Sequence, residues 1–142
     1  MVIRYNDDNS TFIEAAKGIP LRSRMIFIIH GYGENGNEKD YVEMKNRLFG
    51  TVDKIGAIFI VDQRFAVRVG NVLRAIVNTE LVGRQVALVI ERFRELKVIE
   101  TKDVHLIGFS LGAKVSHFAC VWTKNVYGQK IGRVTGELIL NV

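Results

Sequence analysis

The stretch that decides the fold is Val104-His-Leu-Ile-Gly-Phe-Ser-Leu-Gly-Ala-Lys-Val-Ser-His-Phe-Ala119. Its first half is an apolar run typical of a buried strand, and its second half has the spacing of an amphipathic helix. Between them, Gly108-Phe-Ser-Leu-Gly112 has the G-x-S-x-G pattern of a nucleophile elbow, in which a serine lies on a strained turn between strand and helix. The pattern predicts that Ser110 is a nucleophile. The simpler alternative is a serine that only caps the helix.

The sequence on either side of this elbow alternates between strand patterns and helix patterns. The predicted strands cover residues 25–29, 57–61, 104–109 and part of 131–140, and the predicted helices cover 38–49, 78–96 and 111–123. Asn37 is the expected N-cap and Gly50 the expected end of the first of these helices, and residues 2–5 are a candidate edge strand. Strands that alternate with helices predict an α/β fold with a mostly parallel sheet and helices on both faces.

Length, composition and charge restrict the classes of protein. The 142 residues, of which 48% are hydrophobic, fit one domain with a core of its own, so we expect residues 1–142 to form a single domain. The net charge is +5, but basic and acidic residues alternate and no recognition module is visible. We therefore expect no nucleic-acid partner, while weak attraction to anionic lipid surfaces stays open. The oligomeric state is not encoded in any visible pattern.

The single cysteine and the apolar runs bear on location. Cys120 can form no disulfide within this chain and has no metal-ligand neighbour, so we expect a buried apolar side chain and no metal site. No apolar run reaches the roughly 18 residues of a membrane span. The first residues lack a secretory signal, so either the protein is cytosolic or its signal is missing. The triplet Asn9-Ser-Thr11 is a glycosylation acceptor only if the chain is exported.

A second motif, His30-Gly-Tyr-Gly33, follows the first predicted strand. In hydrolases with a nucleophile elbow, a loop at this place supplies one backbone N–H of the oxyanion hole, and the residue after the nucleophile supplies the other. That assigns the two donors to Tyr32 and Leu111. On its own the motif is equally well a loop with a glycine turn, and it is the elbow that favours the oxyanion hole.

The order of these motifs resembles the pancreatic lipase family, particularly its arthropod branch of lipases, phospholipases A1 and yolk-protein relatives. The resemblance rests on residues 25–33, Val61-Asp62, Val82-Gly83, residues 104–113 and Ile131-Gly-Arg-Val-Thr-Gly136. It implies an α/β-hydrolase fold, hydrolysis of acylglycerols or phospholipids at a lipid interface, and secretion. It implies no cofactor and no metal.

Two departures from the family pattern concern the catalytic triad. The family aspartate follows the last of these motifs, and here its position holds Leu138. Glu137 is one residue early, and a one-residue slip in a strand turns the side chain to the opposite face. The family histidine and lid come from a later segment. Together with the missing secretory signal, this leads us to expect a chain truncated at both ends.

No other residue is a convincing substitute for the missing triad members. The resemblance gives His30 a structural role, His105 lies within a strand, and His117 is about 10 Å from Ser110 by helix rise. Asp62 ends a strand but precedes the serine, and we expect it to act as a structural cap.

These patterns lead to one main hypothesis and two alternatives. The main hypothesis is a truncated lipase-family serine ester hydrolase that is weakly active or inactive by itself. One alternative is a non-catalytic, lipid-binding or yolk-type relative that has lost the triad acid. The other is that residues 137–142 come from a translated intron or a frameshift, which would make Leu138 an artefact.

Overall fold

The computed structural model describes residues 1–68 and 70–137. Four strands form one parallel sheet in the order β2-β1-β3-β4. The strands are β1 (Arg24–Ile29), β2 (Ile55–Val61), β3 (Val104–Phe109) and β4 (Arg133–Glu137). The helices are α1 (Asn9–Lys17), α2 (Lys39–Thr51), α3 (Val72–Glu95) and α4 (Leu111–Tyr127), and a short 3-10 turn, η1 (Thr101–Asp103), precedes β3. The predicted α/β class is confirmed.

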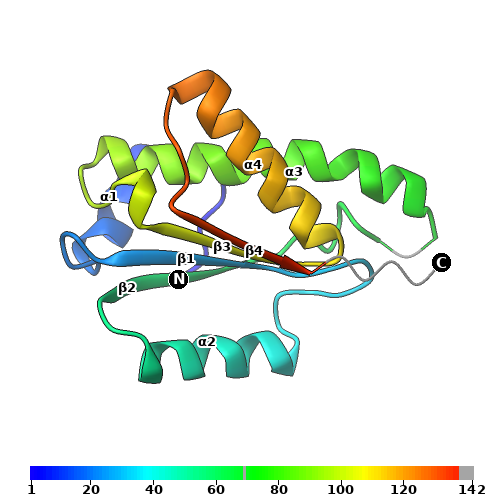
Figure 1. The fold of residues 1–142 in the computed structure, drawn as a ribbon, viewed down its shortest axis with the longest axis horizontal. Coiled ribbons are helices and arrows are strands. Elements are labelled where there is room, and N and C mark those ends of the chain that lie inside the picture. Colours follow the sequence, from blue (N-terminus) through cyan, green and yellow to red (C-terminus); the bar gives the residue numbers. More distant parts are fainter. Residues whose placement is uncertain (69, 138–142) are drawn as a thin grey trace.

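Helices cover both faces of this sheet. Figure 1 shows α2 alone on one face, with α1, α3 and α4 on the other. The larger core lies on the α3 side and contains Phe27, Ile90, Phe93 and Leu106, all at most 2% exposed. A smaller core beneath α2 is formed around Ile26, Ile28 and Tyr41. Strand β1 is buried on both faces, as its continuous apolar run requires.

The parallel register brings three loops to one edge of the sheet. Ile29 at the end of β1 pairs with Val61 of β2 and with Gly108 of β3. Parallel strands end at the same edge, so the residues that follow β1, β2 and β3 lie there together. These residues include His30, Asp62 and Ser110.

The structure corrects the predicted boundaries of two helices. Helix α2 begins after Glu38 rather than Asn37, and it continues through Gly50 to Thr51. The Asn37 amide instead donates to the side chain of Asn35 at 2.9 Å, which closes a turn before the helix. Helix α3 begins at Val72, six residues before the predicted start at residue 78, because its first turns expose apolar side chains that obscure the helical pattern.

The N-terminal region differs more from the prediction. Residues 2–5 form no strand, and helix α1 was not predicted. The Asp8 side chain caps α1 by accepting a hydrogen bond from the amide of Thr11. Phe12 anchors the helix, with its ring edge-on to Phe93 at 5.5 Å. The cap and this single buried aromatic residue were present in the sequence, but one buried position gives no periodicity.

The C-terminal elements agree with the predicted types. Helix α4 extends beyond the predicted end at residue 123 to Tyr127, where Gly128 ends it in the left-handed conformation. Strand β4 pairs with β3, and its five residues are all exposed. Cys120 lies half-buried against the larger core.

Candidate functional site

The elbow at Ser110 joins β3 to α4 in a strained backbone conformation. Ser110 has φ 50° and ψ −116°, a combination that residues other than glycine rarely adopt. Its amide donates to the carbonyl of Glu137 at 2.8 Å, and its carbonyl accepts from the amide of Ala113 at 3.0 Å. The serine side chain makes no capping hydrogen bond, although Ser110 occupies the N-cap position of α4. The hydroxyl is therefore not used for helix capping.

The two glycines of the elbow are required by close backbone contacts. A Cβ at Gly112 would lie 2.1 Å from the carbonyl oxygen of Ile29, and one at Gly108 would lie 2.3 Å from the carbonyl oxygen of Gly112. No side chain fits at such distances, because real Cβ atoms do not approach backbone this closely. The missing side chains let α4 start directly against the ends of β1 and β3.

The loop after β1 lies against this elbow. A Cβ at Gly31 would be 3.1 Å from Ser110 Cβ and 3.3 Å from the carbonyl oxygen of Phe109. The Tyr32 side chain packs on the cluster that contains Leu111 and Ala75. Among the described residues, neither the Tyr32 amide nor the Leu111 amide donates a hydrogen bond to another residue. The structure thus brings the nucleophile candidate and the two expected donor residues together at one edge of the sheet.

His30 is a structural residue of this loop. Its side chain is fully buried, and Nε2 accepts a hydrogen bond from the amide of Gln63 at 2.9 Å. Nδ1 must then carry the proton, which it donates to the carbonyl of Gly31 at 2.9 Å. Because C=O and N–H point in opposite directions across a trans peptide, this bond also fixes the direction of the Tyr32 N–H. Both ring nitrogens are occupied, so His30 has no free nitrogen for Ser110.

The other two histidines lie away from the elbow. His105 is half-buried on β3, and its Nε2 lies 2.9 Å from Thr135 Oγ1. Burial, with Arg133 and Arg24 nearby, lowers the pKa of His105 below its usual value. His105 lies five positions before Ser110 along β3, a distance of about 16 Å. His117 is exposed on α4, where its ring contacts Phe118.

Asp62 has the structural surroundings expected of a cap. It lies just after β2, where its Oδ1 accepts from the amide of Arg64 at 3.1 Å and its Oδ2 from Arg64 Nε at 2.8 Å. Burial alone would raise the pKa of Asp62, but the hydrogen bonds from Arg64 outweigh it and lower the pKa. The carboxylate also lies 3.5 Å from His30 Nε2. The Asp62–His30 pair resembles the acid and base of a catalytic triad. Both ring nitrogens of His30, however, already form hydrogen bonds with Gly31 and Gln63.

Glu137 and Leu138 occupy the place where the family aspartate is expected. A Cβ on Gly136 would meet Ala113 Cβ at 3.0 Å, so Gly136 faces α4. Side chains alternate along a strand, so Glu137 points to the opposite face of the sheet. Its described contact with the elbow is through its backbone carbonyl. Leu138 lies outside the described residues.

Two polar side chains that were not predicted as site residues fix the loop after β1 by hydrogen bonds. Gln63 donates its side-chain amide to the carbonyl of His30 at 2.6 Å. The Glu34 carboxylate accepts one hydrogen bond from the Gly31 amide at 2.6 Å and another from the Tyr41 hydroxyl. Only the position of Glu34 three residues after Gly31, within a tight turn, offered a sequence signal for either residue.

The described residues contain no group of three or more His, Cys, Asp or Glu side chains that could hold a metal ion. In the same part of the chain, no helix is long and apolar enough to cross a membrane.

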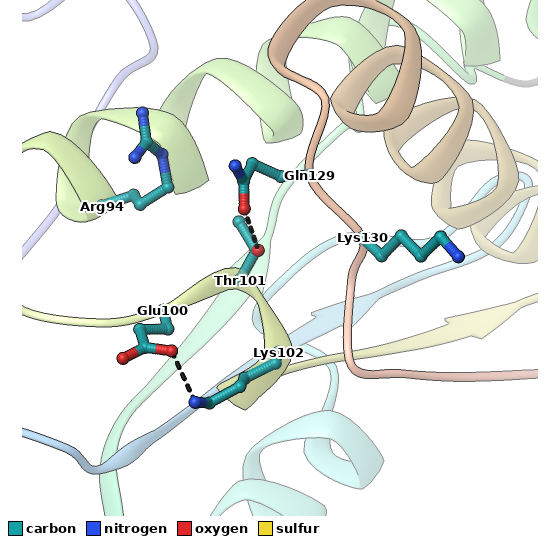
Figure 2. Close-up of a pocket in the computed structure, with 6 residues that line it drawn as sticks. All are labelled: Arg94, Glu100, Thr101, Lys102, Gln129 and Lys130. Atoms are coloured by element: carbon teal, nitrogen blue, oxygen red, sulfur yellow. Dashed lines mark hydrogen bonds and ion pairs between the residues drawn. The ribbon is translucent and has the colours of Figure 1, made fainter.

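A hollow of about 400 Å³ lies near η1, at the start of β3 and therefore at the edge opposite Ser110. Figure 2 shows its polar lining, which includes the Glu100–Lys102 ion pair and Thr101 beside Gln129. It is separate from the elbow.

Known proteins resemble this chain along most of its length. The family model described as Lipase matches residues 5–137. Phospholipase A1 1 of Dolichovespula maculata is 31% identical over 121 residues, covering 80% of this chain and 37% of that protein. Pancreatic lipase-related protein 2 of Sus scrofa is 33% identical over 131 residues, covering 92% of the chain and 26% of that protein. Hepatic triacylglycerol lipase of Homo sapiens is 33% identical over 114 residues, covering 79% and 22%. The chain thus spans between 22% and 37% of the length of these three relatives.

Proposed function

The chain belongs to the lipase family, which has the α/β-hydrolase fold, and from that premise we propose that the protein hydrolyses carboxylic esters of lipids with Ser110 as nucleophile. The named relatives act on phospholipids or on triacylglycerols, so either ester class is a candidate substrate. By family, we also propose that the protein is secreted and works at a lipid interface. The proposed chemistry uses no metal and no organic cofactor.

The first step of this mechanism is acylation of Ser110. Its Oγ attacks the ester carbonyl carbon while a general base takes the hydroxyl proton, and the carbonyl oxygen becomes an oxyanion. The amides of Tyr32 and Leu111 donate hydrogen bonds to that oxyanion. Each such donor typically lowers the barrier by about 2.7 to 4 kcal/mol. Collapse of the intermediate breaks the ester C–O bond, and the alcohol leaves with the proton.

Hydrolysis then returns the enzyme to its starting state. Water attacks the acyl-serine carbonyl, the base takes a proton from the water, and the acid leaves as Ser110 regains its hydrogen. The three described histidines are not placed to serve as this base, and Glu137 points away from α4. We propose that the base and the triad acid come from outside the described residues.

One observation carries the proposal more than any other. Gly31, next to the expected donor Tyr32, lies against Ser110 at the same edge where the serine adopts its strained conformation. A glycine turn or a helix cap requires neither this contact nor the strain. Together they have the form of a nucleophile beside an oxyanion hole.

A serine-reactive fluorophosphonate tests the assignment. We expect it to label the protein that contains the proposed base and triad acid, and we expect Ser110→Ala to remove at least nine-tenths of that labelling. Ser10→Ala, at an exposed serine on α1, is the matched control and should label as the wild type does. Labelling that is clear in the wild type and equally strong in Ser110→Ala would exclude Ser110 as nucleophile.

The non-catalytic, lipid-binding alternative is favoured by the surroundings of the described histidines, none of which faces Ser110. It predicts binding of apolar probes without ester turnover. Hydrolysis of a butyrate ester that depends on Ser110 would exclude it, whereas binding without any turnover would favour it.

A further inference from the structure

Glu34 links three parts of the site through one carboxylate oxygen. Its Oε2 accepts a hydrogen bond from the Gly31 amide at 2.6 Å and another from the Tyr41 hydroxyl. Tyr41 belongs to α2, is 6% exposed, and has its ring 5.4 Å from that of Phe109, the residue before Ser110. The oxyanion loop, α2 and the end of β3 are thereby held to one another.

The same oxygen lies close to the proposed nucleophile. A Cβ at Gly31 would be 3.1 Å from Glu34 Oε2 and also 3.1 Å from Ser110 Cβ. The carboxylate oxygen and Ser110 Cβ are therefore within about 6 Å of each other, a range in which charges interact appreciably. This distance does not place Glu34 in contact with the Ser110 hydroxyl. The hydrogen bond through which Glu34 reaches the loop is the one from the Gly31 amide.

Gly31 is the residue whose position decides where the Tyr32 amide points. As a glycine it has the widest conformational freedom of any residue. His30 holds its carbonyl and Glu34 holds its amide, so both of its backbone polar groups are fixed. Without the bond to Glu34, the peptide between His30 and Gly31 would keep only the hydrogen bond from Gln63. The Tyr32 N–H would then be held through the His30 bond alone and would be more mobile.

We propose that Glu34 is a positioning residue of the oxyanion hole, which it orders by holding the Gly31 amide between Tyr41 and Ser110. This inference rests on the proposed function. Preorganised donors owe their effect to being fixed before charge develops, so a mobile Tyr32 amide stabilises the oxyanion less.

The carboxylate also has an electrostatic effect that separates it from a merely structural residue. A negative charge near a developing oxyanion opposes it. Glutamine keeps an oxygen that can accept from both Gly31 and Tyr41, but it removes the charge. The proposal therefore predicts that Glu34→Gln acylates Ser110 at least as fast as the wild type, whereas Glu34→Ala acylates it more slowly.

The experiment measures the rate constant and the apparent affinity of Ser110 labelling by a fluorophosphonate in the wild type, Glu34→Gln and Glu34→Ala. We expect Glu34→Ala to reduce the maximal labelling rate about tenfold, equivalent to roughly 1.4 kcal/mol, with little change in apparent affinity. Glu34→Gln should restore the rate fully. Glu38→Ala, at an exposed carboxylate in the same segment, is the matched control and should label as the wild type does.

A second measurement does not depend on activity. The Gly31 amide proton should resonate downfield in the wild type and in Glu34→Gln, and should move upfield in Glu34→Ala. Unchanged labelling and an unchanged Gly31 resonance in a folded Glu34→Ala protein would overturn the proposal, as would a Glu34→Gln protein as slow as Glu34→Ala. If Ser110 is unlabelled in every variant while the Gly31 resonance shifts, the proposed function fails and the link through Glu34 stands.

Discussion

The two halves of the site, the elbow after β3 and the loop after β1, are held in place by different means. The elbow depends on side chains that are missing, because Gly108 and Gly112 leave room for backbone to touch backbone. The loop depends on hydrogen bonds between polar side chains and backbone, with His30 bound to Gln63 of a distant segment and Glu34 bound to Tyr41 of α2. The elbow is thus fixed by steric exclusion, and the loop by a hydrogen-bond network.

The difference has an energetic consequence. A steric constraint fails as soon as any side chain is added, and the whole strand-to-helix connection must shift. A hydrogen-bond network weakens stepwise, because each lost partner costs about 1 to 3 kcal/mol and leaves the others in place. Substitutions in the elbow should therefore have the larger effects, and substitutions in the loop should have graded, pH-dependent ones.

The largest effect is expected from Gly112→Ala. The new methyl group would lie 2.1 Å from the Ile29 carbonyl oxygen, which belongs to β1, an inner strand paired on both sides, and cannot move freely. We expect a loss of about 3 kcal/mol or more in the free energy of unfolding, at the upper end for overpacking. Urea denaturation followed by circular dichroism measures it.

Gly50→Ala is the matched control for this prediction. Gly50 lies in α2, and a Cβ there would meet no atom within 4 Å. Alanine is favoured over glycine within a helix, so this variant should gain about 0.5 to 1 kcal/mol. Similar stability changes in the two variants would show that the elbow is not held by steric exclusion.

A smaller, pH-dependent effect is expected from Tyr41→Phe in the loop network. Removing the hydroxyl takes one partner from Glu34 and should cost about 1.5 kcal/mol at pH 7. Burial, together with the Glu34 hydrogen bond and charge, raises the pKa of Tyr41 well above its usual value. The unfolded chain therefore loses the tyrosine proton first, and the wild type loses stability as the pH rises above about 10.

Phenylalanine has no proton to lose, so the stability difference between Tyr41→Phe and the wild type should narrow above that pH. Each pH unit beyond the unfolded pKa removes about 1.4 kcal/mol of the wild-type advantage. Urea midpoints at pH 8 and pH 11 test this. A difference that stays constant or widens between the two would contradict the raised pKa of Tyr41.

The same contrast explains what the sequence could predict. The elbow and the two central strands, β1 and β3, depend on local patterns, and the predicted ranges 25–29 and 104–109 agree with the structure to within a residue. The assignment of Tyr32 and Leu111 to one oxyanion hole implied that the loop after β1 lies beside the elbow, and the contact of Gly31 with Ser110 agrees with that arrangement. The contacts that fix the loop were not, because Gln63 lies 33 residues from His30 and no spacing connects them. The early turns of α3 were missed because exposed Leu73 and Val77 hide its periodicity.

The smallest change in the free energy of unfolding is expected for Ser110→Gly, and the direction of that change is the test. Glycine adopts φ 50° and ψ −116° without the steric penalty that serine bears, which is about 1 to 3 kcal/mol for such conformations. Replacing serine with glycine at an unstrained site is destabilising, because glycine has more freedom to lose on folding. Ser110→Gly should instead gain about 1 kcal/mol while abolishing fluorophosphonate labelling. Ser116→Gly, on the same helix but within its regular turns, is the control and should lose stability. An equal loss of stability in both variants, measured by urea denaturation, would show that the backbone at Ser110 is not strained. The position of the serine would then follow from a rigid but unstrained turn.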